Sequence, residues 1–317
     1  MLLKKKNHIS ADRIKAVVIG HAVADALGVP VEFRSRESLD PAPVTDMMGY
    51  GTYPYPAGTW SDDTSMALAA LDSLATGKVD FDEVMKNFAK WFYEDDYTPT
   101  GKLFDVGGTC ARAIERYSEG VAPTMCGLAE ASANGNGALM RIHPFVLYAY
   151  RKGMRTKEWE RLIFDASALT HRHRRSLIGS GIYTFVLLEL LATPEEESVY
   201  KGLEKARARY EKEPEAVYYQ RIFRDDFAKL PREQIKSSGY VVDTLEAALW
   251  CLLTTDSYRE CVLKAANLGE DTDTVAAIAG GLAGALYGFS GIDGAWRQTL
   301  LRLDYIEQMC DRAYLSW

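Results

Sequence analysis

The sequence is poor in the residues that mark disulfide-bonded scaffolds and zinc proteases. Only five of its 317 residues are cysteines, and no two of them have C-x-x-C spacing. An odd number of widely scattered cysteines is typical of a cytoplasmic protein whose thiols are reduced and buried, so we expect a cytoplasmic location. His171 and His173 do not form an H-E-x-x-H pair, which argues against a zinc protease.

The sequence also lacks an excess of positive charge and a long apolar run. Lys and Arg number 37 against 44 Asp and Glu, so the net charge is −7, which argues against nucleic-acid or membrane partners and suits a protein that binds divalent cations. The first ten residues are basic, but no apolar stretch follows, so we expect no signal peptide. The longest Ala/Gly/Leu-rich run, residues 274–289, is short for a membrane span, and we expect a buried core helix there.

Strand signals are scarce as well. The best are VPVEF at residues 29–33 and YVV at residues 240–242, and neither has a hairpin partner. Helical patterns are common by contrast, with apolar residues at helical spacing or on nearly all sides. These patterns predict helices within residues 11–28, 65–74, 81–95, 174–191, 243–255, 257–268 and 274–289.

Two further predictions concern the charged middle of the chain and the helix after it. Residues 195–233 are rich in Lys, Arg and Glu, which predicts a solvated pair of helices on the periphery. Asp243 with Glu246 three residues later fits a capping box. No repeat or low-complexity linker divides the chain. We therefore predict a single all-α domain over residues 1–317, closed around one site.

Two acidic clusters precede apolar helices, more than two hundred residues apart. The first is Ser61-Asp62-Asp63-Thr64 and the second is Asp271-Thr272-Asp273-Thr274. Helix capping by a Ser or Asp side chain is one explanation. One cap, however, needs one side chain, and each cluster supplies four polar ones. We therefore expect the packing of the two helices to bring the clusters together.

Four buried carboxylates repel one another unless cations neutralise them. Oxygen ligands without nearby Cys or His suit Mg²⁺ or Mn²⁺ rather than Zn²⁺. The clusters together indicate a binuclear site of two such cations, able to activate water. Glu32 and Asp105 are further candidate carboxylates, although either one alone is as readily a surface or capping acid.

Two other segments suggest contact with a phosphate or sugar. Asn134, Gly135, Asn136 and Gly137 leave the backbone accessible, although Asn-Gly is also a plain turn signal. Residues 171–175, HRHRR, concentrate positive charge before a helix. They either contact a phosphate-bearing ligand or form a solvated start of that helix.

These motifs, in this order, resemble those of the ADP-ribosylglycohydrolases, the family that includes dinitrogenase-reductase-activating glycohydrolase and the vertebrate ADP-ribosyl-acceptor hydrolases. The resemblance runs from VIGHAVADALGVPVEF through GTWSDDTSMAL, FDVGGTCARAI, NGNGALMRIHPF and LTHRHRRS to NLGEDTDTVAAIAGGLAGALYG. It leaves out the charged stretch at residues 195–233 and the last part of the chain.

The resemblance implies an all-α fold with two Mg²⁺ or Mn²⁺ ions in a cleft. Its implied metal ligands are Ser61, Asp62, Asp63, Asp271, Asp273 and Thr274, its catalytic residues are Glu32, Asp63 and Asp105, and its substrate-binding residues are Asn134, Gly135, Asn136, Gly137 and His171. The chain departs from the family pattern at Ser61, where Thr is usual, at Gly108, where Asn is common, and at Glu270, where Gly or Asp is more usual.

The implied activity is hydrolysis of the glycosidic bond between ADP-ribose and an acceptor, either a protein side chain or a small conjugate. A monomer is the expected oligomeric state. One alternative is a non-catalytic, ADP-ribose-binding member of the same fold. Another is an all-α, Mg²⁺-dependent terpenoid synthase, but its D-D-x-x-D motif would need an acid where this chain has Met66.

Overall fold

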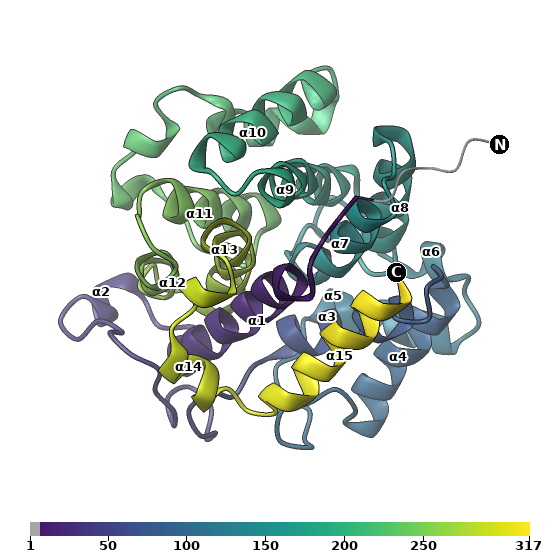
Figure 1. The fold of residues 1–317 in the computed structure, drawn as a ribbon, viewed down its shortest axis with the longest axis horizontal. Helices are drawn as coiled ribbons and strands as arrows, with labels where there is room; N and C mark the ends of the chain where they lie inside the picture. The colour runs from purple at the N-terminus through teal and green to yellow at the C-terminus, as the bar shows by residue number, and fades with distance from the viewer. Residues whose placement is uncertain (1–6) are drawn as a thin grey trace.

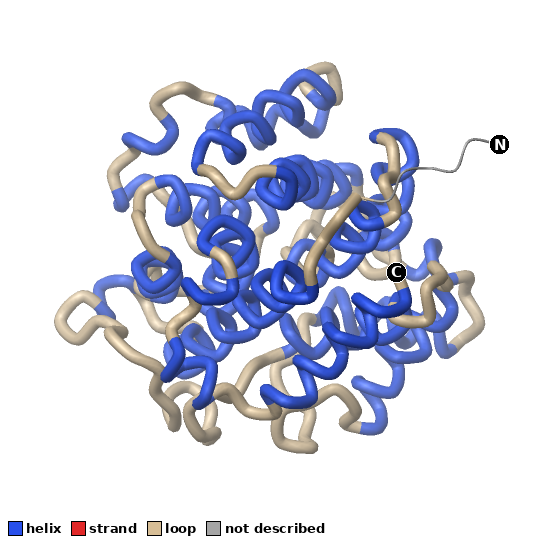
Figure 2. The backbone as a smooth tube through the Cα atoms, in the orientation of Figure 1, coloured by secondary structure: helices blue, strands red, loops and turns tan. Residues whose placement is uncertain are grey.

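The structure, a computed structural model, describes residues 7–317 and is helical throughout, with connecting loops (Figures 1 and 2). The α-helices are α1 Ala11–Gly28, α2 Arg36–Leu39, α3 Asp62–Leu74, α4 Phe81–Glu94, α5 Gly108–Ser118, α6 Pro123–Cys126, α7 His143–Arg151, α8 Thr156–Ala168, α9 Arg174–Ala192, α10 Glu196–Tyr210, α11 Val241–Leu253, α12 Tyr258–Ala266, α13 Thr272–Tyr287, α14 Gly294–Thr299 and α15 Leu303–Ser316. The 3₁₀-helices are η1 Val29–Val31, η2 Leu139–Arg141, η3 Pro214–Phe223, η4 Phe227–Lys229, η5 Arg232–Gln234 and η6 Phe289–Gly291.

The all-α prediction is confirmed within the described residues, where no strand forms and β-type pairing is limited to two isolated bridges. The segments with the best strand signals take other forms. Residues 29–31 form η1, and residues 240–242 belong to the start of α11. The first six residues, part of the segment in which we expect no signal peptide, lie outside the described residues.

Helices α1 and α13 pack against each other, antiparallel, at the centre of the molecule (Figure 1). A Cβ added to Gly284 would lie 1.9 Å from the backbone oxygen of Ala16, and one added to Gly20 would lie 2.7 Å from that of Gly280. Backbones can approach this closely only where side chains are absent. Residues 274–289 were predicted as a buried core helix, and α13 is that helix.

Around this pair the other predicted helices complete one hydrophobic core. Helix α4 buries Val84, Phe88 and Trp91 on one face, whereas Phe81 and Phe92 stay half-buried. Helices α9 and α11 are apolar on most sides and pack on α13. The core residues form a single contiguous cluster that spans the chain.

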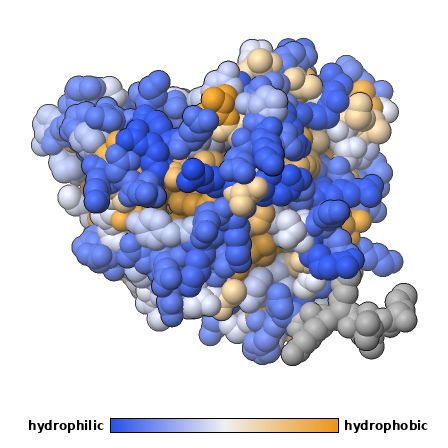
Figure 3. All heavy atoms as spheres, turned by 90° about the horizontal axis from the view of Figure 1, so that it is seen from above, coloured by the Kyte–Doolittle hydropathy of each residue, from blue (hydrophilic) through white to orange (hydrophobic). Residues whose placement is uncertain are grey.

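The charged segment lies on the periphery, where α10 forms the upper edge in Figure 1. The surface seen from above is mostly hydrophilic, with apolar side chains in scattered places (Figure 3). Two helices were predicted here, but only the first is an α-helix, because η3 is a 3₁₀-helix. The backbones of α10 and α9 approach closely at Gly202, where an added Cβ would lie 2.6 Å from the Cα of Val186.

The predicted capping box at Asp243 is wrong. Helix α11 begins two residues earlier, at Val241, with Tyr240 as its N-cap and no side-chain cap. The Asp243 carboxylate instead accepts a hydrogen bond of 2.7 Å from Ser238. Glu246 lies beside Arg221, at 3.3 Å, rather than reaching back to the helix start.

Within residues 7–317, two segments are long and apolar enough to cross a membrane, Ala11–Val31 and Arg174–Ala192. Of the apolar 18-residue window in each, 94% is buried in the first and 78% in the second. Core helices of globular proteins meet the same test of length and composition, so the two segments are weak evidence for a membrane span.

We expect Gly284→Ala to weaken the fold by about 1–3 kcal/mol, because its new methyl group would push the backbones of α1 and α13 apart. Alanine is otherwise better than glycine in a helix by about 1 kcal/mol, so a loss reports steric overlap. The thermal unfolding midpoint measures the effect. Gly294→Ala in α14 is the matched control, since its Cβ would meet only Arg297, at 3.8 Å. Equal midpoints for the two variants would contradict the close packing.

Candidate metal centre and active site

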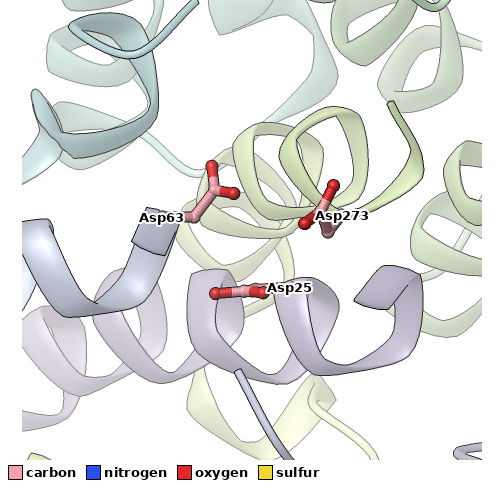
Figure 4. Close-up of side chains that lie close together, drawn as sticks. All are labelled: Asp25, Asp63 and Asp273. Atoms are coloured by element: carbon pink, nitrogen blue, oxygen red, sulfur yellow. The ribbon is translucent and has the colours of Figure 1, made fainter. Parts of the chain in front are cut away.

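Three carboxylates from three helices meet beside the start of α13. Asp25 comes from α1, Asp63 from α3 and Asp273 from α13, and Figure 4 shows them pointing toward one another. One oxygen atom from each lies within 4.8 Å of the others. All three residues are buried. The arrangement depends on the packing of α1 against α13, because it places the end of one helix beside the start of the other.

Hydrogen bonds join the two acidic clusters. The Asp63 carboxylate accepts from the Ser61 hydroxyl at 3.1 Å and from the Thr274 hydroxyl at 3.2 Å. Asp63 and Thr274 are 211 positions apart in the sequence. The two clusters, each at the start of its own helix, therefore form one site.

Capping accounts for only part of these clusters. The Ser61 side chain caps α3, where it accepts from the Asp63 backbone at 3.3 Å. Asp271 occupies the N-cap of α13 but makes no side-chain cap bond. Its carboxylate instead accepts from the Asn136 amide at 2.7 Å. The carboxylates of the two clusters are therefore not used as helix caps and are available for another role.

A second group of carboxylates adjoins the first. Oxygen atoms of Glu32, Asp105 and Asp273 lie within 4.8 Å of one another. Glu32 follows η1, and Asp105 stands in a loop before α5 with a positive φ of 51°, a conformation that non-glycine residues seldom adopt. Asp273 thus belongs to both groups and joins them into a continuous acidic site.

Burial and mutual repulsion make these carboxyls hard to ionise. Burial, followed by the charge of Asp105, raises the pKa of Glu32 to about 9. Burial raises the pKa of Asp25 to about 7 and, together with the charge of Asp271, that of Asp105 to about 6. The pKa values of Asp62, Asp63 and Asp273 are likewise raised well above the ordinary range, chiefly by burial.

Unpartnered oxygen atoms show which carboxylates suit a cation. Asp63 Oδ1, Asp273 Oδ2 and Glu32 Oε2 are buried without a hydrogen-bond partner, which is costly for a charged group unless a cation binds it. Both oxygens of Asp25, in contrast, already accept from Ser61 N at 3.0 and 3.1 Å, and one also accepts from Thr64. These residues therefore fit one or more hard cations at Asp63, Asp273 and Glu32.

Asp25 was not singled out from the sequence. Its carboxylate holds the start of α3, since it accepts from the backbone of Ser61 and Thr64 and, at 2.6 Å, from the Thr64 hydroxyl. The signal was present, because Asp25 is an acid within a helix that is otherwise apolar on nearly every side. A carboxylate in the buried part of a helix needs a partner.

The site opens into a cavity of about 310 Å³. It is lined by Glu32, Phe33, Asp62, Asp105, Val106, Gly107, Gly108, Thr109, Cys110, Gly135, Asn136, Gly137, Met140, His171, Gly239, Asp271 and Thr274. A larger hollow, of about 790 Å³, lies against η3. That hollow is lined by charged residues that are mostly exposed, and neither group of clustered carboxylates lies in it. The buried carboxylates therefore place the candidate site at the smaller cavity.

The glycine-rich segment forms one wall of this cavity. A Cβ on Gly137 would lie 2.7 Å from Cys110 Sγ and 2.9 Å from His171 Cε1, so only glycine fits there. Asn136 bridges Asp271 and Thr244 through its amide, at 2.7 and 2.9 Å. The segment thus keeps a carboxylate of the second cluster in place.

Asn134 differs from its neighbours because it is absent from the cavity lining. Its amide donates to the Ala131 carbonyl, and its oxygen accepts from Ser176 at 2.9 Å. The side chain therefore connects the loop to α9 rather than facing a ligand.

The basic segment divides between the cavity and the start of α9. His171 lines the cavity, but Arg174 and Arg175 pair with Glu213 at 2.7 Å and Glu215 at 2.8 Å. His173 caps α9. For these three residues the structure favours the helix start over the phosphate contact that the sequence left open.

The chain is similar to several known proteins. The chain is 32% identical to an ADP-ribosylarginine hydrolase of Serratia proteamaculans, over 96% of this chain and 80% of that protein. It is 32% identical to the ADP-ribosyl-[dinitrogen reductase] glycohydrolase of Rhodospirillum rubrum, over 91% and 90%. A solved structure described as an ADP-ribosylglycohydrolase-related protein complex matches with a TM-score of 0.82 and 31% identity, covering 96% of this chain and 98% of that one.

The profile of one family, described as ADP-ribosylglycohydrolase, matches residues 6–317. The match therefore includes the charged stretch and the end of the chain, which the motifs alone had left out. The terpenoid synthase alternative is not favoured by any of these matches. The chain belongs to the ADP-ribosylglycohydrolase family.

Proposed function

We propose that this protein hydrolyses the bond between ADP-ribose and the guanidino group of an arginine side chain, with the help of two divalent cations, Mg²⁺ or Mn²⁺. The observation that carries the proposal is the meeting of both acidic clusters with Glu32 and Asp105 at one cavity. Two relatives named as ADP-ribosylarginine hydrolases, 32% and 33% identical, support the choice of acceptor.

The cations would be held by the hydroxyls and carboxylates of the two clusters. The proposed ligands are Ser61, Asp62, Asp63, Asp271, Asp273 and Thr274. Hard oxygen donors of this kind suit Mg²⁺ and Mn²⁺. When bound, such ions orient ribose hydroxyls and make a coordinated water more acidic.

Glu32 is the proposed base. Its unpartnered Oε2 takes a proton from the attacking water. The water oxygen bonds to the anomeric carbon as the bond from that carbon to the acceptor nitrogen breaks, and the proton passes to that nitrogen. Burial, followed by the charge of Asp105, raises the pKa of Glu32, and positive charge beside it would lower that pKa toward the range in which the carboxylate is ionised and acts as a base. Asp105, on the same wall, orients the water.

The rest of the cavity suits the ADP-ribose part of the substrate. Gly107 and Gly108 line it at the start of α5, a helix whose N-terminus has no side-chain cap. Backbone N–H groups at such a helix start favour a phosphate. Gly135, Gly137 and His171 form the facing wall.

The acceptor would enter through an adjoining hollow of about 340 Å³, which shares Glu32 and Asp271 with the cavity and adds Glu270. Three carboxylates favour a positively charged group. Phe33 lines the same hollow with 70% of its surface exposed, and an aromatic face attracts a guanidinium. An arginine acceptor fits this combination better than a neutral one.

We further propose that the active protein is a cytoplasmic monomer with a single domain. All five cysteines are free thiols and buried in the structure, as a reducing compartment requires. The size of the protein in solution, measured by light scattering, tests the oligomeric state.

The acceptor is tested by incubating the protein with peptides that carry ADP-ribose on arginine or on serine, with Mg²⁺ and Mn²⁺ in turn. We expect ADP-ribose to be released from the arginine conjugate at least about tenfold faster, since the acidic hollow attracts the cationic acceptor. Liquid chromatography of released ADP-ribose measures this. Equal release from both peptides would contradict the assignment of arginine, and no release from either would contradict the hydrolase.

Asp273→Asn removes the carboxylate that both acidic groups share. Because loss of even an outer-shell partner lowers metal affinity or activity by about 10–100-fold, we expect loss of this direct ligand to lower activity at least about 100-fold. Calorimetric titration with Mn²⁺ measures the lost binding. Asp12→Asn is the control, because Asp12 is also the second residue of its helix but is exposed. Unchanged Mn²⁺ binding in Asp273→Asn would remove this residue from the site.

The raised pKa values predict how stability without metal depends on pH. A carboxyl whose pKa is raised in the folded state stabilises the fold while it is protonated, and this contribution is lost as pH rises through the folded pKa. With chelator, the unfolding midpoint should therefore fall from about pH 4, where such carboxyls ionise in the unfolded chain, to about pH 9, the folded pKa of Glu32. Asp105 and Asp25 contribute to the fall only up to about pH 6 and about pH 7. Added Mg²⁺ or Mn²⁺ should raise the midpoint more at the upper end.

Glu32→Gln should flatten the upper part of that fall, since it removes the group with the highest pKa. Differential scanning fluorimetry over the pH series measures both effects. A metal-induced rise in midpoint that is the same at every pH would contradict the assignment of these carboxyls as the binding groups.

A further inference from the structure

Arg141 is a fully buried cation beside the cavity. It ends η2, directly after the glycine-rich segment, and is 0% exposed. Both terminal nitrogens donate to the Ala166 carbonyl at 3.2 Å, and the guanidinium carbon lies 4.9 Å from the centre of the Phe88 ring. No ion pair with an acid is formed by Arg141 anywhere in the part of the chain that the structure describes. A buried charge without a counter-ion is unfavourable. The one other hydrogen bond that Arg141 makes therefore matters for its role.

That remaining bond goes to a hydroxyl next to His171. Arg141 Nη2 donates to Thr170 Oγ1 at 2.7 Å. The same Oγ1 lies 2.9 Å from His171 Nδ1. Thr170 and His171 are both buried, at 0% and 2% exposed. The three side chains therefore form a chain of two short hydrogen bonds that ends on the imidazole ring.

The donor and acceptor properties of the three side chains decide which atom donates in each of the two hydrogen bonds. A guanidinium only donates, so Thr170 Oγ1 accepts from Arg141 and keeps one hydrogen to give. The candidate acceptors are His171 Nδ1 and the Cys110 thiol beside it. An imidazole nitrogen is a far stronger acceptor than sulfur, and the Cys110 thiol has the Gly137 carbonyl 3.8 Å away as its own partner. The hydroxyl thus donates to Nδ1, and the ring carries its proton on Nε2.

Nε2 of His171 lies beside the glycine wall of the cavity. A Cβ on Gly135 would lie 3.4 Å from Nε2, and one on Gly137 would lie 3.6 Å from it. Both glycines line the cavity, and neither has a side chain that could cover the nitrogen. The atom that bears the proton is therefore the one that a ligand in the cavity can reach.

We propose that Arg141 and Thr170 are positioning residues, which hold His171 in the tautomer that presents an Nε2–H donor to an oxygen atom of ADP-ribose. The identity of this ligand rests on the proposed function, whereas the tautomer does not. Burial and the charge of Arg141 lower the pKa of His171 to about 3, so the ring stays neutral at physiological pH. A neutral ring has one donor and one acceptor nitrogen, and Arg141 decides which is which.

The tautomer can be read directly from the nitrogen chemical shifts of the histidine ring in the ¹⁵N-labelled full chain with Mg²⁺. His171→Gln identifies the signals. In the wild type we expect Nε2 to be protonated and Nδ1 bare. Thr170→Val keeps the side-chain shape but removes the hydroxyl, so both tautomers should become populated. Thr170→Ser retains the hydroxyl and should behave as the wild type does.

The affinity for ADP-ribose, measured by calorimetry, should fall about tenfold in Thr170→Val, as expected for one hydrogen bond made by a fraction of the molecules. Thr184→Val is the matched control. Thr184 is also 0% exposed, but its hydroxyl donates at 2.7 Å to the Ser180 carbonyl within its own helix. This variant should leave both the tautomer and the affinity unchanged. Arg141→Gln should shift the tautomer as Thr170→Val does. If Arg141→Gln does not fold, the comparison of Thr170→Val with Thr170→Ser tests the proposal by itself.

A wild-type ring with its proton on Nδ1 would overturn the proposal, and so would a Thr170→Val variant whose tautomer does not change. A wild type with the expected tautomer that does not bind ADP-ribose would instead contradict the proposed function. The two failures are therefore distinguishable by separate measurements.

Discussion

The site depends on how closely the backbones of α1 and α13 approach each other. A Cβ on Gly28 would fall 2.3 Å from the Cα of Asp273, and the Thr272 hydroxyl donates to the Gly28 carbonyl at 2.8 Å. This contact joins the end of the first helix to the start of the thirteenth. With side chains between the two helices, Glu32 and Asp25 would lie several ångströms farther from the second acidic cluster, and no shared cation site would form.

The same packing brings several buried carboxylates close enough to repel one another. Buried and half-buried carboxyls from α1, α3, α13 and two loops share one region, and no side chain lining the adjoining cavity is basic other than His171. Without metal, burial and mutual repulsion both favour the protonated carboxyls, and the pKa values rise. With metal, the charge is balanced and the oxygen atoms gain partners. The folded state is thus prepared for cations at the expense of its own stability.

Much of this could be predicted from the sequence, because the relevant signals are local. Apolar spacing indicated the main helices, and a run of four polar side chains before each of two apolar helices was more than capping requires. What could not be predicted are pairings that depend on distant segments. Arg174 and Arg175 looked available for a ligand, yet their partners lie about forty residues away in a peripheral segment. Asn134 and Asn136 look equivalent in the sequence, but only the second faces the cavity.

The rim of the acceptor hollow is built differently from the metal centre. Phe33 and Glu270 both have positive φ, at 63° each, and are tied by a bond of 2.7 Å from Phe33 N to Glu270 O. Their side chains project from loop backbone that this bond and its partner, Glu270 N to Arg34 O, hold rigid. The side chains at these two positions can therefore change without changing the carboxylates on the helix starts, so the proposed acceptor preference can vary separately from the proposed hydrolytic chemistry.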